Sequence, residues 1–362
     1  MSQKEKTIVV KIGSSLLVDD LSGKLRMDFL YHLMNDVAYY KERGDKIVLV
    51  SSGSVALGRR FSSIDAGVDL TLAQKQAAAA HGQPALMAAY QQFANEHNLR
   101  TAQILITLHD FEDRKRFLNA EDALEELLKQ GSVPIVNEND TVATKHLRVG
   151  DNDRLSAKVV QLVEAHELVI LTDVNGLWDG DGKIIEHVET LDDSVFAMAG
   201  GASGSGTGGM RTKLMAAEIA SLSGCRTHIT SGHNITPIRD AIEGTGLHTV
   251  IESKTTPENA RHLWIATSLD VKGRLEISKD VLLTLGEGVA LLPSQIMRTE
   301  GEFGRGDVVE LVCGEVECGR GIVAFNANEV KALMGRENPD VLAVLGYKTR
   351  PEIIHKNDLA LL

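Results

Sequence analysis

The sequence predicts an α/β protein in which a three-layer domain with a parallel sheet precedes a small, mostly β domain. Two observations carry this prediction. Up to about Leu263, short segments rich in Val, Ile and Leu alternate with longer segments of helical periodicity. Beyond that point the segments become short and strand-like, with glycine turns between them. We therefore expect two domains, residues 1–265 and 272–362, joined near Ala266–Lys272.

The predicted strands of the first domain are nearly continuous in branched apolar side chains. Strands covered by helices on both faces have this composition. They are Thr7–Ile12, Lys46–Ser51, Ala102–Thr107, Val133–Asn137, Glu167–Thr172 and Thr227–Thr230. Because strands that alternate with helices are joined by crossover connections, we expect a parallel sheet with helices on both faces.

The predicted helices lie between these strands. Met27–Arg43 places Leu30, Leu33 and Val37 at helical spacing and ends before Gly44. Further helices are predicted at Leu72–His97, Leu118–Gln130, Asp151–Ala165, Leu191–Ala199 and Thr212–Ser223.

The C-terminal region has a different pattern. Short strands are expected from Gly273 to Phe325, followed by a helix at Ala327–Met334 and another strand at Val341–Leu345. This predicts a small β-rich domain.

Composition and charge restrict the function. The chain has 362 residues and a formal net charge of -12, which argues against bulk nucleic-acid binding and against docking on anionic membranes. Three cysteines form no disulfide framework, and Cys313 and Cys318 lack the companions of a metal site. The polar N-terminus resembles no signal peptide, and no segment is apolar enough to span a bilayer. We expect a cytoplasmic protein with no metal-ligating residues.

Two polar segments follow predicted strands near the start of the chain. Lys11 precedes Gly13, so a positive charge and accessible backbone amides would face an anion, although a surface lysine before a turn has the same local sequence. Ser51–Ser54 combines small hydroxyls with Gly53 and suits close approach to a ligand, or an ordinary helix N-cap. In open α/β sheets, ligands bind outside the carboxyl ends of the strands.

Amide and carboxylate groups are concentrated in two further segments, Asn137–Asp140 and Gly150–Asp153. Such groups could hold an ammonium group, a metal or lysine side chains; the alternative is an Asx-rich loop. Thr172 and Asp173 end another predicted strand and could contact a nucleotide or a metal.

A glycine-rich segment leads into the predicted helix that contains Lys213. Glycines before a helix N-terminus form a phosphate cradle, because backbone amides and the helix dipole both favour an anion; a surface loop is the alternative. Gly204, Gly206 and Gly209 match a dinucleotide-binding pattern, but the preceding segment is a predicted helix rather than a strand. No P-loop, HExxH or GxSxG motif occurs.

Taken together and in order, these segments resemble the amino-acid-kinase family, over about the first 260 residues. The C-terminal region resembles a PUA domain. The segments that carry the resemblance are Lys11–Ser15, Ser51–Gly53, Asn137–Asp140, Val149–Asp153, Leu171–Asp173 with Gly176–Leu177, and Gly206–Lys213. The family often has Thr at the position of Ser51, and Thr-Ser at the positions of Ser14 and Ser15. Both differences preserve the hydroxyl groups. Within the family, the Asn137–Asp140 and Gly150–Asp153 pair resembles the branch that phosphorylates free glutamate.

The resemblance implies a role for each residue. Lys11, Lys213 and Asp153 would be catalytic, with the lysines on the phosphates of ATP and Asp153 orienting them. Ser52, Asp140 and Asn152 would hold L-glutamate. The nucleotide would contact Lys11, Thr172, Asp173, Thr207, Gly208, Gly209, Met210, Arg211, Thr212 and Lys213.

The resemblance also implies chemistry and partners. A glutamate carboxylate is ionised at neutral pH and needs no general base, so Mg2+, lysines and amides would serve to neutralise charge. The product would be γ-glutamyl phosphate, in the first step of proline biosynthesis. A glutamyl phosphate reductase would consume it, proline would be a feedback inhibitor, and the chain would form a dimer or tetramer.

Two other interpretations stay open at this point. One is another kinase of the same family that acts on a different carboxylate, carbamate or a nucleotide. The other is RNA binding through the PUA-like domain. Val271–Leu362 contains 11 Lys and Arg against 14 Asp and Glu with no basic cluster, which disfavours nucleic acid.

Overall fold

The computed structural model describes residues 5–19, 22–61, 68–143, 151–199, 209–268, 270–337 and 339–362, with only the backbone of Asp151. The chain divides into two compact units, Met1–Pro257 and Glu258–Leu362. The sequence-based division into residues 1–265 and 272–362 remains a proposal.

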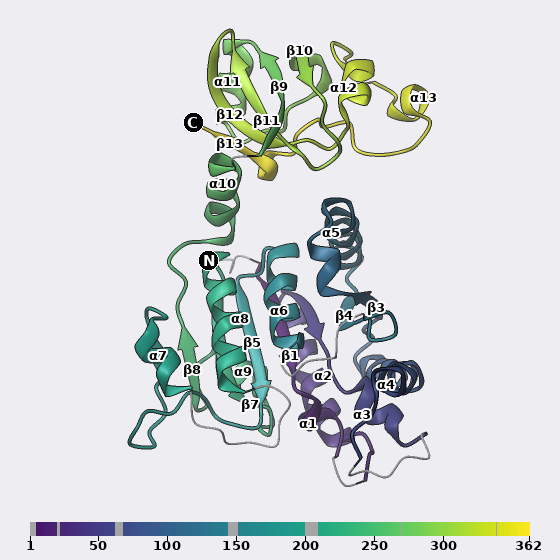
Figure 1. The fold of residues 1–362 in the computed structure, drawn as a ribbon, viewed down its shortest axis with the longest axis vertical. Helices are drawn as coiled ribbons and strands as arrows, with labels where there is room; N and C mark the ends of the chain where they lie inside the picture. The colour runs from purple at the N-terminus through teal and green to yellow at the C-terminus, as the bar shows by residue number, and fades with distance from the viewer. Residues whose placement is uncertain are drawn as a thin grey trace. The chain divides into compact units, whose positions relative to one another are not determined.

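The first unit is built on one eight-stranded sheet within the described residues, in the order β3-β4-β2-β1-β5-β7-β8-β6 (Figure 1). Its strands are β1 (Thr7–Ile12), β2 (Lys46–Val50), β3 (Thr101–Ile106), β4 (Val133–Glu138), β5 (Glu167–Thr172), β6 (His187–Val188), β7 (Arg226–Ser231) and β8 (His248–Ile251). All pairs from β3 to β7 are parallel, which confirms the predicted parallel sheet. The β7–β8 pair is antiparallel. The sequence analysis missed β6 and β8 because segments of two and four residues carry too little pattern.

Helices cover both faces of this sheet (Figure 1). Alternate residues of a strand point to opposite faces, so Val10 joins one core and Val9 the other. The first core contains side chains of α1 (Ser14–Leu17), α2 (Met27–Glu42), α3 (Ser54–Arg59), α4 (Leu72–Glu96) and α9 (Pro237–Ile242). The second contains side chains of α5 (Arg114–Lys129), α6 (Asp151–Leu162) and α8 (Met210–Leu222), with α7 (Asp193–Met198) packed beside it.

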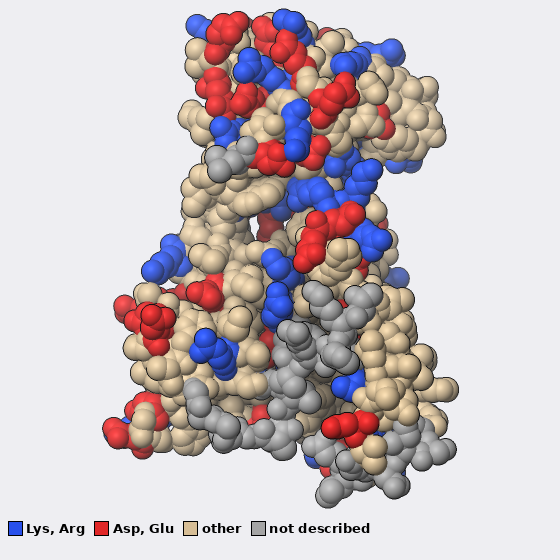
Figure 2. All heavy atoms as spheres, viewed as in Figure 1, with Lys and Arg blue, Asp and Glu red and all other residues tan. Residues whose placement is uncertain are grey.

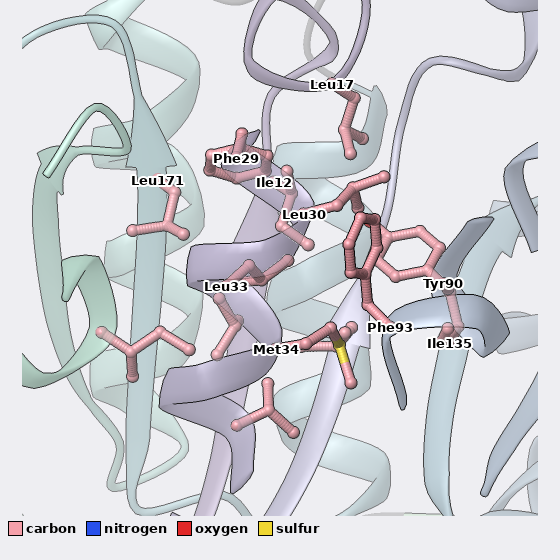
Figure 3. Packing of buried hydrophobic residues seen from close by; sticks show 14 of the residues in the cluster. Ile12, Leu17, Phe29, Leu30, Leu33, Met34, Tyr90, Phe93, Ile135 and Leu171 are labelled. Atoms are coloured by element: carbon pink, nitrogen blue, oxygen red, sulfur yellow. The ribbon is translucent and has the colours of Figure 1, made fainter. Parts of the chain in front are cut away.

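The first core is closed by aromatic side chains from α4. Figure 3 shows Leu30 and Met34 of α2 close to the rings of Tyr90 and Phe93, with Phe29 on the side nearer Ile12. All of these side chains are at most 9% exposed, so they bind α2 and α4 to the sheet through burial of apolar area. This core includes Ile12 at the end of β1 and Leu49 near the end of β2.

Two glycines allow α3 and α4 to cross at very short distance. A Cβ at Gly58 would lie 1.7 Å from the carbonyl oxygen of Ala78, and one at Gly82 would lie 1.9 Å from that of Ser54. No side chain fits in either place. The contact fixes the start of α3, where Ser54 lies, against the middle of α4.

The second unit contains a five-stranded sheet in the order β10-β9-β11-β12-β13. Its strands are β9 (Val271–Ile277), β10 (Ile296–Gly301), β11 (Val308–Cys313), β12 (Val316–Ile322) and β13 (Leu359–Leu361). The pairs are antiparallel except β9 with β11. The helices are α10 (Pro257–Thr267), α11 (Lys279–Gly286), α12 (Ala327–Leu333) and α13 (Val341–Leu345). The unit is therefore mostly β around its own core, as expected.

Two details of the C-terminal prediction were wrong. Val341–Leu345 forms α13 rather than a strand, because Asp340 caps it by accepting from the amide of Ala343 and Gly346 ends it at a φ of 81°. Lys279–Gly286 forms α11 within the region assigned to strands, with Ser278 as its cap. Short apolar segments carry no reliable period, so the flanking caps decide.

In the parts of the chain that the structure describes, no helix has the length and apolar character needed to cross a bilayer.

Candidate functional site

The candidate site lies at the carboxyl ends of parallel strands. β1 is central, with β2 on one side and β5 on the other, and the chain crosses from β4 to β5 through α6. A strand flanked in this way is the topological switch point, where open α/β sheets bind ligands. The polar segments singled out in the sequence follow β1, β2, β4 and β5 at this edge.

Three charged side chains meet at the end of β1. The ammonium of Lys11 lies 2.8 Å from Oδ1 of Asp153, and that of Lys213 lies 3.6 Å from Oδ2. None of these side chains is more than 8% exposed. They come from β1, α6 and α8, so three elements converge on one carboxylate. Two buried ammonium groups share one buried carboxylate, which leaves a local positive charge.

Burial and charge act in opposite directions on these groups. Burial by itself would raise the pKa of Asp153, but the charges of Lys11 and Lys213 and the hydrogen bonds it accepts hold that pKa below its ordinary value. Burial lowers the pKa of Lys213, and Asp153 opposes this shift. The carboxylate is therefore held ionised between its two partners.

The N-terminus of α8 adjoins this cluster. Gly209 is the N-cap of the helix and provides no side-chain hydrogen bond to the first turn, so that turn suits an anion, although the amide of Thr212 already donates to the carbonyl of Gly209. The hydroxyl of Thr212 donates to Oδ2 of Asp153 at 2.6 Å, which ties the helix to the cluster. Arg211 is directed elsewhere, with its guanidinium 5.7 Å from the ring of Phe196. Met210 packs on the second core. Thr207 and Gly208 lie outside the described residues.

The end of β5 contributes Thr172 and Asp173. Thr172 is buried and donates its hydroxyl to Oδ1 of Asp173 at 3.0 Å, while Asp173 is exposed. The amide of Gly13 donates to the carbonyl of Leu171 at 3.2 Å, which holds the end of β1 beside the end of β5.

A network of amide side chains begins at Asn152, the residue that precedes Asp153 of the lysine cluster. Nδ2 of Asn152 donates to the hydroxyl of Ser52 at 2.8 Å, to the carbonyl of Ser51 at 3.0 Å and to Oδ1 of Asn137 at 3.3 Å. Nδ2 of Asn137 in turn donates to Oε1 of Gln83 at 2.9 Å. The ends of β2 and β4 are thus linked to α6 and α4.

Asp140 lies two residues beyond β4. Its Oδ2 accepts from the hydroxyl of Ser54 at 2.9 Å, which orients the carboxylate. Both residues line a cavity of about 230 Å³, together with Gln83, Glu138, Gln103 and Pro84 among others. A cavity of that size can enclose a small metabolite.

The structure brings together most of the residues predicted from the sequence. Lys11, Asp153, Lys213 and Thr212 form one cluster, and Ser52 and Asn152 form a second that adjoins it along α6. The sequence analysis missed Gln83. One feature of the sequence could have indicated it. Gln83 lies four residues after Ala79 and three before Leu86, which are both buried, so a polar side chain stands on the core-facing side of the helix.

Comparison with known proteins identifies the family. Residues 6–231 match the amino acid kinase family, and residues 273–345 match the PUA domain. The chain is 44% identical to the glutamate 5-kinase of Paramagnetospirillum magneticum over 98% of both chains. It is also 43% identical to the glutamate 5-kinase of Roseobacter denitrificans, over 98% of this chain and 96% of that relative. The chain belongs to the glutamate 5-kinase family.

A solved structure supports the same fold. Carbamate kinase from Giardia lamblia bound to AMP-PNP superposes with a TM-score of 0.52 at 20% identity, over 70% of this chain and 100% of that one. In this member of the glutamate 5-kinase family, as the sequence predicted, an amino-acid-kinase domain is followed by a PUA domain.

Proposed function

We propose that this chain transfers the γ-phosphoryl group of ATP to the side-chain carboxylate of L-glutamate, giving γ-glutamyl phosphate and ADP. The observation that carries the proposal is the buried pair of lysines held by Asp153 at the uncapped start of α8. This arrangement suits a polyanion, and it adjoins polar groups that suit an amino acid. The relatives named above are glutamate 5-kinases over nearly the whole chain.

The chemistry needs no proton transfer to create the nucleophile. The side chain of glutamate has a pKa near 4.3 and is ionised at neutral pH. The barrier arises from bringing this anion to a triphosphate, so positioning and charge neutralisation are required. Lys11 and Lys213 supply positive charge to the transferred phosphoryl group and its neighbours. Asp153 keeps both ammonium groups in place, and ATP enters as its magnesium complex.

The nucleotide site is proposed along the end of β5 and the start of α8. Thr172 and Asp173 would line one side of it. Amides from Gly209 onward would face the phosphates, and the adjacent Thr207 and Gly208 complete the proposed segment. Arg211 contributes less than its position suggests, because its guanidinium stacks on Phe196.

Glutamate would bind beside this site, on Ser52, Asp140 and Asn152. The carboxylate of Asp140 suits the α-ammonium group, and such a partner favours a free amino acid over an N-acylated one. Asn152 donates to the hydroxyl of Ser52 and directly precedes Asp153 in the chain, so it links the proposed amino-acid groups to the lysine cluster.

The family suggests further properties that we carry as proposals. Proline would inhibit by binding over the glutamate pocket. A glutamyl phosphate reductase would consume the acyl phosphate, which hydrolyses readily, and the chain would assemble into a dimer or tetramer in the cytoplasm.

RNA binding through the second unit is the competing function. On the face shown in Figure 2, Lys and Arg are interspersed with Asp and Glu over that unit rather than gathered into one basic area. Phosphate contacts dominate the affinity of nucleic-acid binding, so interspersed charge favours the kinase alone. A filter-binding assay with tRNA at low salt tests this; tight, salt-sensitive binding would support the RNA function.

The kinase proposal is tested by trapping the product. The purified chain is incubated with ATP, Mg2+ and hydroxylamine, with glutamate, aspartate or N-acetylglutamate as acceptor. Hydroxylamine converts an acyl phosphate into a coloured hydroxamate, and we expect a signal with glutamate alone. A signal with aspartate or N-acetylglutamate instead would assign that acid as the substrate. No signal with any of the three acids would refute the proposed kinase activity.

A further inference from the structure

The side-chain amides of Gln83, Asn137 and Asn152 are hydrogen-bonded in series. Backbone groups determine which atom of each amide donates and which accepts. The amide of Glu138 donates to Oδ1 of Asn137 at 2.9 Å. A backbone N–H can only donate, so the amide of Asn137 has one possible orientation. Its Nδ2 therefore points to Gln83, which must accept through Oε1.

This orientation leaves a donor at one end of the series. Nε2 of Gln83 is buried and has no hydrogen-bond partner among the residues that the structure describes. Gln83 as a whole is only 9% exposed, yet it lines the cavity that Ser54 and Asp140 also line. Buried donors in native proteins are nearly always paired, so this one indicates an acceptor that the described residues do not supply.

The other end of the series offers an acceptor. Nδ2 of Asn152 donates to the carbonyl of Ser51, which can only accept, so the orientation of this amide is determined as well. Its Oδ1 is buried and has no partner within the described ranges. The cavity is lined by Asp140, which offers a carboxylate, and by Gln83, which carries the unpaired donor, and Asn152 is joined to Gln83 through Asn137. An α-amino acid carries the complementary pair, an ammonium group and a carboxylate.

We propose that Gln83 is a specificity residue for the amino-acid substrate, whose Nε2 donates to the α-carboxylate while its Oε1 holds Asn137. This inference rests on the proposed function and adds to it the group that recognises the α-carboxylate. The site then selects an acid with both an α-ammonium and an α-carboxylate group.

A purely structural role for Gln83, as a support for Asn137, must be separated from this one. Gln83→Glu does so, because the new side chain has the same shape and still offers an acceptor to Asn137. Only the atom that faces the ligand changes, from donor to acceptor. Gln92→Glu is the matched control, since it adds the same charge to the same helix, α4, at an exposed position that is not among the residues lining the cavity.

The readout is the preference for glutamate over its α-amide, measured as the ratio of kcat/KM values in the hydroxamate assay. We expect Gln83→Glu to reduce this preference by about tenfold or more, because an α-amide can donate to the new carboxylate whereas an α-carboxylate is repelled. The KM for glutamate should rise by a similar factor. The KM for ATP in Gln83→Glu should stay within about twofold of the unmodified chain, and so should the preference and the KM for glutamate in Gln92→Glu.

A Gln83→Glu variant with an unchanged preference and an unchanged glutamate KM would reduce Gln83 to a structural support. If that variant does not fold, Gln83→Met replaces it. Loss of the donor should still reduce the preference for glutamate over its α-amide, whereas loss of support for Asn137 alone would lower kcat/KM for both substrates equally. If the unmodified chain forms no hydroxamate with glutamate, the proposed function fails, and the same preference is then measured from calorimetric binding of glutamate and its α-amide.

Discussion

The ammonium of Lys11 lies 2.8 Å from Oδ1 of Asp153, and both side chains are buried. The second oxygen of Asp153 accepts from Thr212 at 2.6 Å and faces Lys213 at 3.6 Å. One carboxylate thereby joins the end of β1 to the start of α8. We infer that Asp153 positions the two lysines, while the lysines contact the phosphates.

Asp153→Asn tests this positioning role. The change keeps the shape of the side chain but leaves two buried ammonium groups without a counter-charge, so we expect the free energy of unfolding to fall by about 3 kcal/mol. Magnesium–ATP would supply the missing negative charge. Thermal unfolding with and without magnesium–ATP should therefore show a larger ligand-induced rise in Tm for the variant than for the unmodified chain. Equal Tm values without ligand would contradict this account.

Lys213→Ala tests the phosphate contact. We expect kcat to fall by about 10²–10³-fold, as for loss of one preorganised electrostatic contact, while the protein remains folded because Lys11 still pairs with Asp153. Steady-state kinetics and circular dichroism measure the two effects. Lys158→Ala is the control, since Lys158 lies on α6 and donates to Gln161. Retention of kcat in Lys213→Ala would remove the phosphate assignment.

Asp140→Asn tests the proposed ammonium contact. The amide can still accept from Ser54, so the geometry is preserved and only the charge is lost. We expect the KM for glutamate to rise by about tenfold or more, with the KM for ATP within about twofold. Kinetics with each substrate varied in turn provide the comparison. If glutamate and ATP were affected equally, Asp140 would have no selective role in amino-acid binding.

The lowered pKa of Glu167 makes the free energy of unfolding depend on pH. This buried residue begins β5 and accepts from Lys6 at 2.8 Å and contacts His228 at 3.1 Å. Burial alone would raise its pKa, but the hydrogen bonds and charges of His228 and Lys6 outweigh burial and lower that pKa to about 2. On acidification the unfolded chain binds this proton first. The stabilisation is therefore complete above a pH of about 5 and is lost as the pH falls toward about 2.

Glu167→Gln removes this contribution. We expect the variant to be less stable by up to about 3 kcal/mol at neutral pH, and to lose less stability between about pH 5 and pH 2. Urea unfolding at a series of pH values measures both, with the exposed Glu126→Gln as control. Parallel stability profiles for Glu167→Gln and the unmodified chain would exclude Glu167 as a source of the acid dependence.

Much of this fold could be predicted from the sequence because the central strands are covered on both faces. Such strands are long apolar segments, and Thr7–Ile12 and Glu167–Thr172 were predicted with the bounds that the structure gives them. Val341–Leu345 was misassigned because five consecutive apolar residues fit a strand or a helix equally well. Only its flanking cap residues, Asp340 and Gly346, distinguish the two.

The candidate site could be predicted in part for a similar reason. Lys11 and Lys213 stand at the end of a strand and the start of a helix, and those boundaries are visible in the sequence. Gln83 stands in the middle of α4, and its position depends on the close crossing of α3 and α4 at Gly58 and Gly82. That contact is tertiary, so no local pattern could reveal it.

The most direct test of the central claim follows the oxygen atoms of glutamate. The enzyme is given ATP, Mg2+, hydroxylamine and glutamate labelled with ¹⁸O in the side-chain carboxylate. Attack by that carboxylate on the γ-phosphorus makes a labelled oxygen the bridge of the acyl phosphate, and hydroxylamine then attacks carbon and releases phosphate that keeps the bridge. We predict one ¹⁸O in each phosphate, detected by ³¹P NMR. Phosphate without label would show that water attacks ATP instead, and would contradict the proposed kinase activity.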